Sequence, residues 1–417
     1  MHLSRRTVLG GIGALGATLA APGVVGQEDK SILDMFARNR MLREADPTGN
    51  TARAIDAVET PEPVLSADTI YNLQRATAQY EQIVAAGGWP AMPREAFKLQ
   101  LGVSKRAAVS VKRRLIASGD MANAKSVDDA FDSEADAALR LFQARHGLII
   151  NGQVDEPTLH ALAVPADFRL QQLRLNAMRL QMVAPSIDSA RYVVVNIPAA
   201  AIEAVDGGMV SQRHTAVVGR IERQTPILSS RIHQINFNPY WNVPKSIIQR
   251  DLIKFMNEDP EYLTKWKIHI YDQRGNEIMP QEVDWSTDEA VQYQFRQEPG
   301  AENSMGHVKI NFRNPHDVYL HDTPQKALFG ENSRFYSSGC VRVEGADQLV
   351  AWLLRDNGGW DLNTVQAAFD SNERLDVDVN DPVPIHTTYI SAWANRQGTV
   401  SFRSDVYDFD ENGQVIF

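Results

Sequence analysis

The chain has 417 residues, of which 43% are apolar and 23% are charged, and its formal net charge is -10. This length exceeds what one typical hydrophobic core accommodates, and the composition is ordinary for a soluble globular protein of two or three domains. The acidic balance excludes the basic surface by which proteins bind nucleic acid or an anionic membrane.

The first 26 residues have the order of a signal peptide. Arg5 and Arg6 form a basic start, a stretch rich in Gly, Ala and Leu runs to Ala21, and small residues lead to Gly26. The arginine pair is typical of the twin-arginine export route, so we expect residues 1–26 to be removed after export. An uncleaved anchor is the alternative, but the apolar run is short and glycine-rich for a bilayer span. We expect no stable membrane span once the signal is removed.

Residues 27–94 are predicted to be a polar lead-in followed by one helix. Apolar side chains such as Leu73 and Tyr80 recur at three- and four-residue spacing between residues 67 and 86, which predicts a helix there. Gly87 and the residue after it are glycines, and prolines follow closely, so the helix is expected to end at this point.

Residues 95–166 are predicted to fold into a compact helical unit. One helix stops near Gly119, and a second begins after Asp132 and ends near Gly147. Asp155 is placed to cap a third helix, because proline follows in the first helical turn.

Two runs in this unit carry a resemblance to a known family. The segments 142–148 (FQARHGL) and 157–162 (PTLHAL) are similar to the peptidoglycan-binding-like three-helix domain. A helical spacer without a ligand is the alternative, since such domains often only position a catalytic partner. Residues 167–189 are then predicted to be a helical linker.

A β-rich domain is predicted for residues 190–410. Runs rich in β-branched residues indicate strands at 192–198, 215–219, 232–237, 308–312, 388–393 and 399–402. A charged, tryptophan-containing segment at 246–300 interrupts these strands. An interruption of that length is typical of a lid or substrate-binding subdomain, so we expect a capping insertion.

Cys340 is the only cysteine of the chain. An exported protein normally pairs its cysteines in disulfides, and this residue has no partner in its own chain. The thiol is therefore either an inert buried group or a nucleophile. A nucleophilic thiol needs a base or a cation nearby, because an ordinary cysteine is mostly protonated at neutral pH.

His321 is the candidate base. It lies 19 residues before Cys340 at the end of an apolar run, a separation that lets the chain fold back on itself. An ion pair between imidazolium and thiolate would activate the sulfur, and the imidazolium could later protonate a leaving amine. The other histidines lack the spacing of metal ligands, so we expect no metal site.

The residues around the thiol suggest further roles. Gly339 lets the backbone approach a substrate. Its amide and that of Cys340 could donate hydrogen bonds to an oxyanion. One such donor typically lowers the activation free energy by about 3 kcal/mol. Arg334 and Arg342 flank the thiol and could bind a substrate carboxylate or lower the pKa of the thiol. A structural arginine is the alternative for each of them.

The segments 319–324 (YLHDTP) and 337–343 (SSGCVRV) together resemble the active-site signature of the YkuD-fold L,D-transpeptidases. The larger periplasmic subfamily fits best, because it combines a peptidoglycan-binding-like domain with a catalytic domain that carries a capping insertion. The resemblance implies an α+β multidomain fold with a small helical domain and a β-rich catalytic domain. The commoner family signature has a second histidine at Ser338 and an asparagine at Arg342, so only His321 can be assigned as the base.

The resemblance also implies the reaction. Cys340 would attack an L,D peptide bond in a peptidoglycan tetrapeptide stem, form an acyl-thioester and pass the stem to an amine as a 3→3 cross-link. Residues that would bind substrate are Tyr319, Asp322, Arg334, Ser337, Ser338 and Arg342. A backbone carbonyl near Asp322 would orient the imidazole. No cofactor is expected, peptide stems and other wall synthases are the expected partners, and carbapenems would acylate the thiol.

Two alternative functions stay open at this point. The same thioester could be given to water, which would make the protein an L,D-carboxypeptidase or a hydrolase of wall linkages. A non-catalytic peptidoglycan-binding protein is the alternative from a different class. All of these readings place the mature chain in the periplasm.

Overall fold

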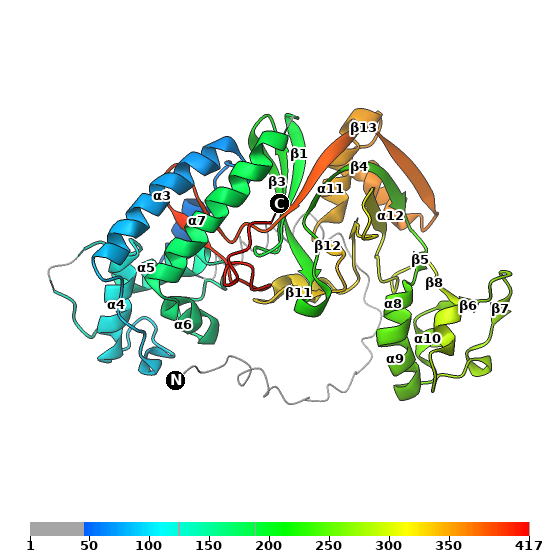
Figure 1. Cartoon of the computed structure of the whole chain (residues 1–417), viewed down its shortest axis with the longest axis horizontal. Coiled ribbons are helices and arrows are strands. Elements are labelled where there is room, and N and C mark those ends of the chain that lie inside the picture. Colours follow the sequence, from blue (N-terminus) through cyan, green and yellow to red (C-terminus); the bar gives the residue numbers. More distant parts are fainter. Residues whose placement is uncertain (1–45, 124–125, 188, 417) are drawn as a thin grey trace.

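The computed structural model describes residues 46–123, 126–187 and 189–416. The predicted signal peptide, residues 1–26, and the first part of the polar lead-in lie outside the described residues. Figure 1 shows helices at one end of the molecule, a large sheet in the middle and a small cap at the other end. Within the described ranges, no helix is both long and apolar enough to cross a bilayer.

Six α-helices build the helical end of the described chain. They are α2 (Asn50–Val58), α3 (Ala67–Ala85), α4 (Ala107–Ala117), α5 (Ser133–Arg145), α6 (Glu156–Ala163) and α7 (Ala166–Val183). The helix predicted near residues 67–86 is confirmed as α3. It begins at the cap Ser66, whose side chain accepts the N–H of Thr69, and it ends before Gly87, which adopts a φ of 97°.

The helices α4, α5 and α6 share one hydrophobic core, which includes Val111, Leu139, Phe142 and Leu162. The predicted caps are present: Asp132 accepts the N–H of Ala135 at 2.8 Å, and Asp155 accepts that of Thr158 at 2.9 Å. Each cap satisfies a backbone donor that a helix start would otherwise leave unpaired.

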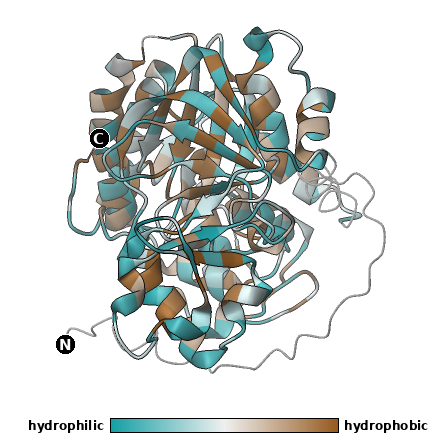
Figure 2. Ribbon diagram, turned by 90° about the vertical axis from the view of Figure 1, so that its right-hand side faces the viewer, coloured by the Kyte–Doolittle hydropathy of each residue, from teal (hydrophilic) through white to brown (hydrophobic). Residues whose placement is uncertain are grey.

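The central sheet has nine strands in the order β11-β3-β12-β10-β9-β4-β13-β1-β2, and β2 also pairs with β3, so the sheet closes on itself. Its strands are β1 (Arg191–Asn196), β2 (Ala201–Asp206), β3 (Met209–Gly219), β4 (Leu228–Phe237), β9 (Val308–Phe312), β10 (Leu320–His321), β11 (Phe335–Ser337), β12 (Val341–Val343) and β13 (Leu375–Thr388). Hydropathy alternates along several of these strands (Figure 2). Helices α11 (Ala346–Leu353) and α12 (Leu362–Asp370) contribute to the same core as the strands.

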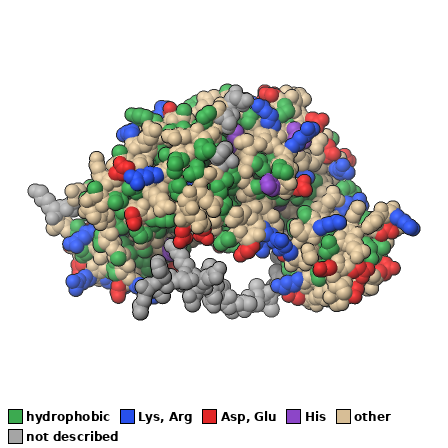
Figure 3. Space-filling model, viewed as in Figure 1, with side chains coloured by type: hydrophobic (Ala, Val, Ile, Leu, Met, Phe, Trp, Pro, Cys, Tyr) green, Lys and Arg blue, Asp and Glu red, His purple; other side chains and the backbone are tan. Residues whose placement is uncertain are grey.

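The cap is a separate small body with its own hydrophobic core, which includes Ile248, Leu263, Ile270 and Phe295. Its strands pair in the order β5-β8-β6-β7. Its elements are β5 (Trp241–Asn242), α8 (Lys245–Ile247), a π-helical turn (Ile248–Leu252), α9 (Ile253–Glu258), α10 (Tyr262–Lys265), β6 (Ile268–Tyr271), β7 (Glu277–Ile278) and β8 (Gln294–Gln297). Acidic and basic side chains are interspersed on its surface (Figure 3).

The tail of the chain returns to the helical end. β14 (Ala392–Ala394) and β15 (Val400–Phe402) form a hairpin that packs in one core with α3 and α7. The strand predicted at 388–393 is therefore wrong in its bounds, because β13 ends at Thr388 and β14 begins at Ala392. The α+β multidomain prediction is confirmed.

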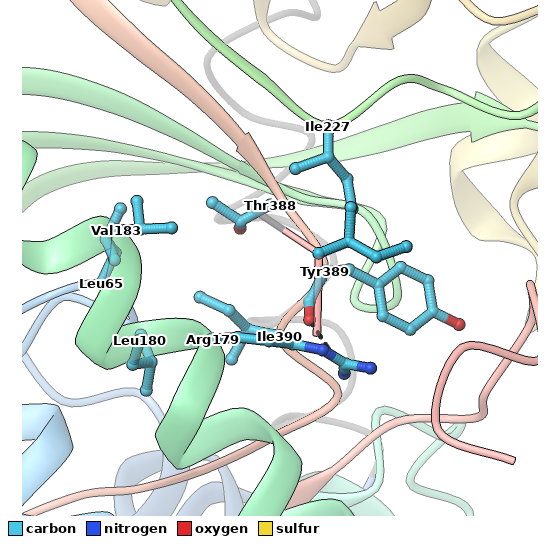
Figure 4. A pocket seen from close by; sticks show the side chains of 9 residues that line it. Leu65, Arg179, Leu180, Val183, Ile227, Thr388, Tyr389 and Ile390 are labelled. Atoms are coloured by element: carbon cyan, nitrogen blue, oxygen red, sulfur yellow. Dashed lines mark hydrogen bonds between the residues drawn. The ribbon is translucent and has the colours of Figure 1, made fainter. Parts of the chain in front are cut away.

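A cavity lies between α7 and the end of β13 (Figure 4). Apolar side chains line most of it, including Leu65, Leu180, Val183 and Ile390, and its volume is about 10 Å³. That volume accommodates about one water molecule, so this cavity is no substrate site.

Candidate active site

Two short parallel strands, β10 and β12, bring the cysteine and the histidine together. His321 pairs with Arg342 across these strands. The N–H of Val341 donates to the carbonyl of Tyr319 at 3.0 Å, which places the preceding Cys340 beside Tyr319. Because neighbouring strands lie about 4.8 Å apart and two residues span about 6.6 Å, the Cα atoms of Cys340 and His321 are on the order of 8 Å apart.

These side chains share one face of the sheet. Side chains alternate along a strand, so Tyr319 and His321 point to the same side, as do Cys340 and Arg342. The intervening apolar residues, such as Leu320, are fully buried in the hydrophobic core on the other side. The alternation therefore separates an apolar face, which holds the fold together, from a polar face that carries the candidate site.

The polar face extends across five strands as a continuous row. Each residue of the row pairs with the next across neighbouring strands. In order, the row is Asp376 (β13), Asn236 (β4), Lys309 (β9), His321 (β10) and Arg342 (β12). The amide of Asn236 donates to Asp376 at 2.7 Å. The row places two cations, Lys309 and Arg342, on either side of the imidazole.

Neither cation forms an ion pair with a carboxylate of the described residues. The ammonium of Lys309 lies 4.4 Å from the centroid of the Tyr319 ring. Arg342 donates to the neutral side chain of Gln325 at 2.5 Å, and its buried Nε has no hydrogen-bond partner in the described chain. Burial lowers the pKa of both groups. The positive charge here is consequently available to a nearby anion.

The side chain of Cys340 is partly buried and packs against the hydrophobic core. Burial raises the pKa of the thiol, because a thiolate loses its hydration there. The backbone N–H and the hydroxyl of Tyr319 donate toward the sulfur and oppose this rise, as do the charges of Lys309 and Arg342. The environment therefore keeps the resting thiol protonated but is equipped to stabilise negative charge on it.

The imidazole of His321 is oriented by the backbone. Its Nδ1 lies 2.6 Å from the carbonyl oxygen of Asp322, so Nδ1 carries the proton and donates it there. Nε2 is then the unprotonated nitrogen and can accept a proton. Burial, and next the charge of Arg342, lower the pKa of His321 to about 3.

These two pKa shifts bear on the expected imidazolium–thiolate ion pair. A raised thiol pKa and a lowered imidazole pKa both favour the neutral forms of the two groups. The shifts count against the expected ion pair, which stays a prediction, and sequence spacing alone did not indicate the burial or the cations that cause them. The neutral imidazole suits a base that takes the proton during attack.

The loop that carries the thiol is held by Ser337. Its hydroxyl donates to the carbonyl of Cys340 at 2.5 Å and accepts the N–H of Gly339 at 3.1 Å. Gly339 adopts a φ of 116°, a conformation that favours glycine. Its amide is thus engaged within the loop, whereas the amide of Cys340 has no acceptor among the described residues. Of the two expected oxyanion donors, only the amide of Cys340 is free.

A second loop links the thiol to the cap. Arg223 donates to Ser338 at 2.8 Å and to both carboxylate oxygens of Asp251, at 2.5 Å and 3.0 Å. Asp251 belongs to the π-helical turn of the cap. Ser338 therefore serves as an attachment point between the cysteine loop and the cap.

Two other predicted substrate-binding residues are engaged in structural contacts. The carboxylate of Asp322 is 3% exposed, forms an ion pair with Lys326 and accepts the N–H of His307. The guanidinium of Arg334 donates to the backbone carbonyls of Glu331 and Ala199. Tyr319, Ser337 and Arg342 lie at the thiol, so the structure brings together only part of the predicted set.

Several residues support the site through contacts to which the sequence reasoning assigned no role. Thr225 donates to the carbonyl of Gly339 at 2.9 Å and accepts the N–H of Gly219 at the same distance. The hydroxyl of Tyr407, from the tail, donates to the carbonyl of Gly219 at 2.6 Å. A Cβ on Gly219 would lie 2.2 Å from a backbone oxygen, so this glycine is required by close packing. Such partners are distant in sequence and give no local signal.

In the described ranges, no group of three or more His, Cys, Asp or Glu side chains is arranged to hold a metal ion. The groups that the described chain brings together here are a thiol, an imidazole, the amide of Cys340 and two cations.

Two family models match separate parts of the chain. Residues 190–385 match the model described as "L,D-transpeptidase catalytic domain" (YkuD), and residues 106–162 match the model described as "Putative peptidoglycan binding domain". A curated protein of Haemophilus influenzae named "Putative L,D-transpeptidase" is 33% identical over 241 residues, which cover 58% of this chain and 48% of that protein. The matched region thus spans about half the length of this curated relative.

Solved L,D-transpeptidases are also similar to the chain. One from Xylanimonas cellulosilytica is 14% identical, with 72% of this chain and 100% of that chain covered and a TM-score of 0.23. L,D-transpeptidase 3 from Mycobacterium tuberculosis is 13% identical, with 48% and 61% covered and a TM-score of 0.25.

Proposed function

Because the chain contains a YkuD-type L,D-transpeptidase catalytic domain beside a peptidoglycan-binding-like domain, we propose that it is a cysteine-dependent L,D-transpeptidase of peptidoglycan tetrapeptide stems. The observation that supports this most directly is the shared polar face of β10 and β12, on which the thiol lies diagonally opposite an imidazole whose Nδ1 is already bonded to a carbonyl. That arrangement leaves Nε2 of His321 to serve the sulfur.

In the first half-reaction, the sulfur of Cys340 attacks the carbonyl carbon of the L,D peptide bond while Nε2 of His321 takes the thiol proton. The oxyanion of the tetrahedral intermediate accepts the N–H of Cys340. When the C–N bond breaks, His321 returns the proton to the leaving amine of the terminal D-residue. The stem is then held as a thioester, and both side chains are neutral again.

In the second half-reaction, an amine from another stem attacks the thioester carbonyl. His321 accepts a proton from this amine, and the thiolate leaves and is reprotonated. The product is a 3→3 cross-link and the free thiol. Water in place of the amine would yield a tripeptide instead, so acceptor access decides between transfer and hydrolysis.

The two cations beside the thiol influence when the proton moves. Lys309 and Arg342 stabilise negative charge on sulfur and disfavour positive charge on His321, and both effects are strengthened by burial. The proton therefore moves during attack rather than before it. This behaviour differs from that of cysteine enzymes with a preformed ion pair.

The test is incubation of the purified protein with a disaccharide-tetrapeptide, followed by mass spectrometry. We expect a cross-linked dimer, and a thioester between the stem and Cys340 in short incubations. A Cys340→Ala variant is the control and should form neither. Formation of tripeptide alone would show that the protein is a hydrolase. If the wild type forms neither product nor a carbapenem adduct on Cys340, the protein is non-catalytic.

The proposal places the mature protein outside the cytoplasm, where peptidoglycan lies, and we propose the periplasm and twin-arginine export. Fractionation of cells with and without an Arg5→Lys, Arg6→Lys change would test this. Retention of the changed protein in the cytoplasm is expected, and unaffected export would contradict the route.

A further inference from the structure

Arg220 is a third cation near the thiol, and the reaction described above does not use it. It follows Gly219, the last residue of β3, and its backbone N–H donates to the carbonyl of Ser337 at 3.1 Å. Its guanidinium donates to the carbonyl of Tyr336, also at 3.1 Å. Both acceptors belong to the segment that leads to Cys340, so Arg220 lies against the cysteine loop.

The neighbouring Arg223 shows what sets Arg220 apart. Arg223 bonds to the cysteine loop at Ser338, and both carboxylate oxygens of Asp251 balance its charge. Arg220 has no ion pair with a carboxylate of the described chain, and its buried Nε has no hydrogen-bond partner there. Of these two arginines on the cysteine loop, only Arg220 therefore lacks a counter-charge.

Arg342 lies on the other side of the same loop. The strand β3, which ends next to Arg220, pairs with β12, which begins after the thiol and carries Arg342. Arg220 bonds to the loop four residues before Cys340, at Tyr336, whereas Arg342 is the second residue after Cys340. An anion that contacts both guanidinium groups would consequently lie next to the sulfur.

The two arginines share a lack of opposite charge. The buried Nε of Arg342 has no partner among the described residues, and its guanidinium donates to the neutral Gln325. Burial, and next the charge of Arg220, lower the pKa of Arg342, so the two like charges lie close enough to repel each other. Partly buried like charges without a carboxylate are costly, and a bound anion reduces that cost. The pair is therefore suited to bind an anion.

The proposed reaction brings one anion to this place. The bond that Cys340 attacks joins a carbonyl carbon to the amine of the terminal D-residue, whose carboxylate is free in a tetrapeptide stem. Only the amide nitrogen and one Cα separate the carboxylate carbon from that carbonyl carbon, so the two carbons are roughly 3–4 Å apart. Guanidinium groups next to the sulfur are thus within reach of the terminal carboxylate, which they can bind in bidentate fashion.

We propose that Arg220, together with Arg342, binds the free carboxylate of the terminal D-residue and so limits the enzyme to stems that end at this residue. The inference rests on the proposed function, because it concerns the substrate of the same thiol. Arg220 determines specificity and transfers no proton. Arg334, which the sequence pattern suggested for a carboxylate, donates to backbone carbonyls instead. An amidated terminus carries no negative charge and leaves the arginine pair without its partner.

The test compares two donors that contain the same L,D bond. One is a disaccharide-tetrapeptide with a free terminal carboxylate, and the other is the same molecule with a terminal carboxamide. Mass spectrometry of the released D-residue or its amide gives kcat/KM for each donor. We expect the wild type to prefer the free carboxylate by about 10- to 100-fold, the usual effect of a hydrogen bond to a charged group.

Arg220→Gln is the test variant, because glutamine retains a donor for the carbonyl of Tyr336 but carries no charge. The preference for the free carboxylate should fall by about tenfold. Arg220→Lys restores the charge without the bidentate geometry and should recover part of the preference. Arg313→Gln is the matched control, because Arg313 is exposed just beyond β9 and should leave the preference as it is in the wild type.

A change that only disturbs the cysteine loop would slow the cleavage of both donors equally and leave their ratio unchanged. An unchanged ratio in Arg220→Gln would therefore remove Arg220 from carboxylate binding. Equal cleavage of both donors by the wild type would overturn the inference and leave the proposed function intact. A wild type that cleaves neither donor and forms no carbapenem adduct on Cys340 would overturn the proposed function and the inference with it. Unfolding midpoints verify that each variant is folded.

Discussion

Two regions of the described chain place charged side chains in different surroundings. At the junction between the helical end and the tail, Arg145 meets Asp120 at 2.5 Å and Arg179 meets Asp410 at 2.6 Å, with all four side chains at most 4% exposed. Asp410 also accepts from Gln172 at 2.8 Å. Arg145 and Arg179 thus each have a carboxylate in contact, whereas the buried Arg169 nearby donates to the neutral side chain of Gln172.

Beside the thiol the arrangement is reversed. Lys309 lies against an aromatic ring and Arg342 against a neutral amide, without a carboxylate on either. Paired charges stabilise one arrangement of the chain, whereas unpaired ones are costly and are found where a reaction or a ligand supplies the missing charge. Because the junction also holds a buried arginine without a carboxylate, an unpaired cation alone does not mark a reacting site. The polar row differs in having a thiol and an imidazole beside its cations.

The largest expected effect concerns proton transfer. His321→Gln removes the base and retains an amide that can bond to the carbonyl of Asp322, so the fold should persist. We expect acylation of Cys340 by a carbapenem to slow by about 10²–10⁴-fold, the usual contribution of a general base. Stopped-flow fluorescence measures the rate, and near-wild-type acylation would remove His321 from the mechanism.

The next largest effect concerns the junction. Asp410→Ala leaves the guanidinium of Arg179 buried without its partner, so the free energy of unfolding should fall by about 3–5 kcal/mol. The double variant Arg179→Leu, Asp410→Leu should recover part of this loss, because it removes both charges of the pair. Urea unfolding measures both. A single variant as stable as the wild type would contradict the structural role of the pair.

The rate at which the Cys340 thiol is alkylated should depend on pH in a way that reports its protonation state. The thiol pKa is raised by burial, and imidazole with a pKa of about 3 is neutral above that pH. The rate of iodoacetamide alkylation should therefore climb about tenfold per pH unit from pH 5 to pH 8 without a plateau. A preformed thiolate–imidazolium pair would instead give a plateau in this range. Mass spectrometry of quenched samples measures the rate.

A smaller effect is expected for the unpaired lysine. Lys309→Met removes a positive charge near the sulfur, so the thiolate becomes less favourable and alkylation at pH 7 should slow by about fivefold. Lys254→Met is the control, because Lys254 is exposed on the cap and its loss should leave the rate unchanged. Equal rates for Lys309→Met and the wild type would show that the charge does not reach the thiol.

The smallest effect is expected at the cap. Arg223→Ala breaks the contacts to Asp251 and Ser338, which are partly exposed and contribute about 1 kcal/mol. We expect faster proteolysis of the cap and a KM about threefold higher, with kcat little changed. Lys265→Ala, which breaks an exposed ion pair within the cap, should alter neither quantity. A lower kcat with an unchanged KM would instead indicate that Arg223 takes part in the reaction itself.

The candidate pair of His321 and Cys340 could be identified from the sequence, because the signals that mark each residue are local. The segments around His321 and Cys340 each contain an apolar strand end and a turn, and adjacent parallel strands then bring them together. Lys309 was not singled out, since its place beside His321 depends on the register of β9 against β10. The contacts of Arg223 likewise join segments that are distant in the chain.

The amino-acid sequence by itself determined the α+β class, the order of the helical and β-rich parts and the thiol with its candidate base, because periodicity, caps and local motifs are properties of neighbouring residues. Only the tertiary structure decided that the amide of Gly339 is engaged, that Arg334 and Asp322 contact backbone and neighbouring side chains, and that the buried imidazole lies between two cations without a carboxylate partner in the described chain. Desolvation and cross-strand contact set these properties, and both depend on residues that only folding brings together.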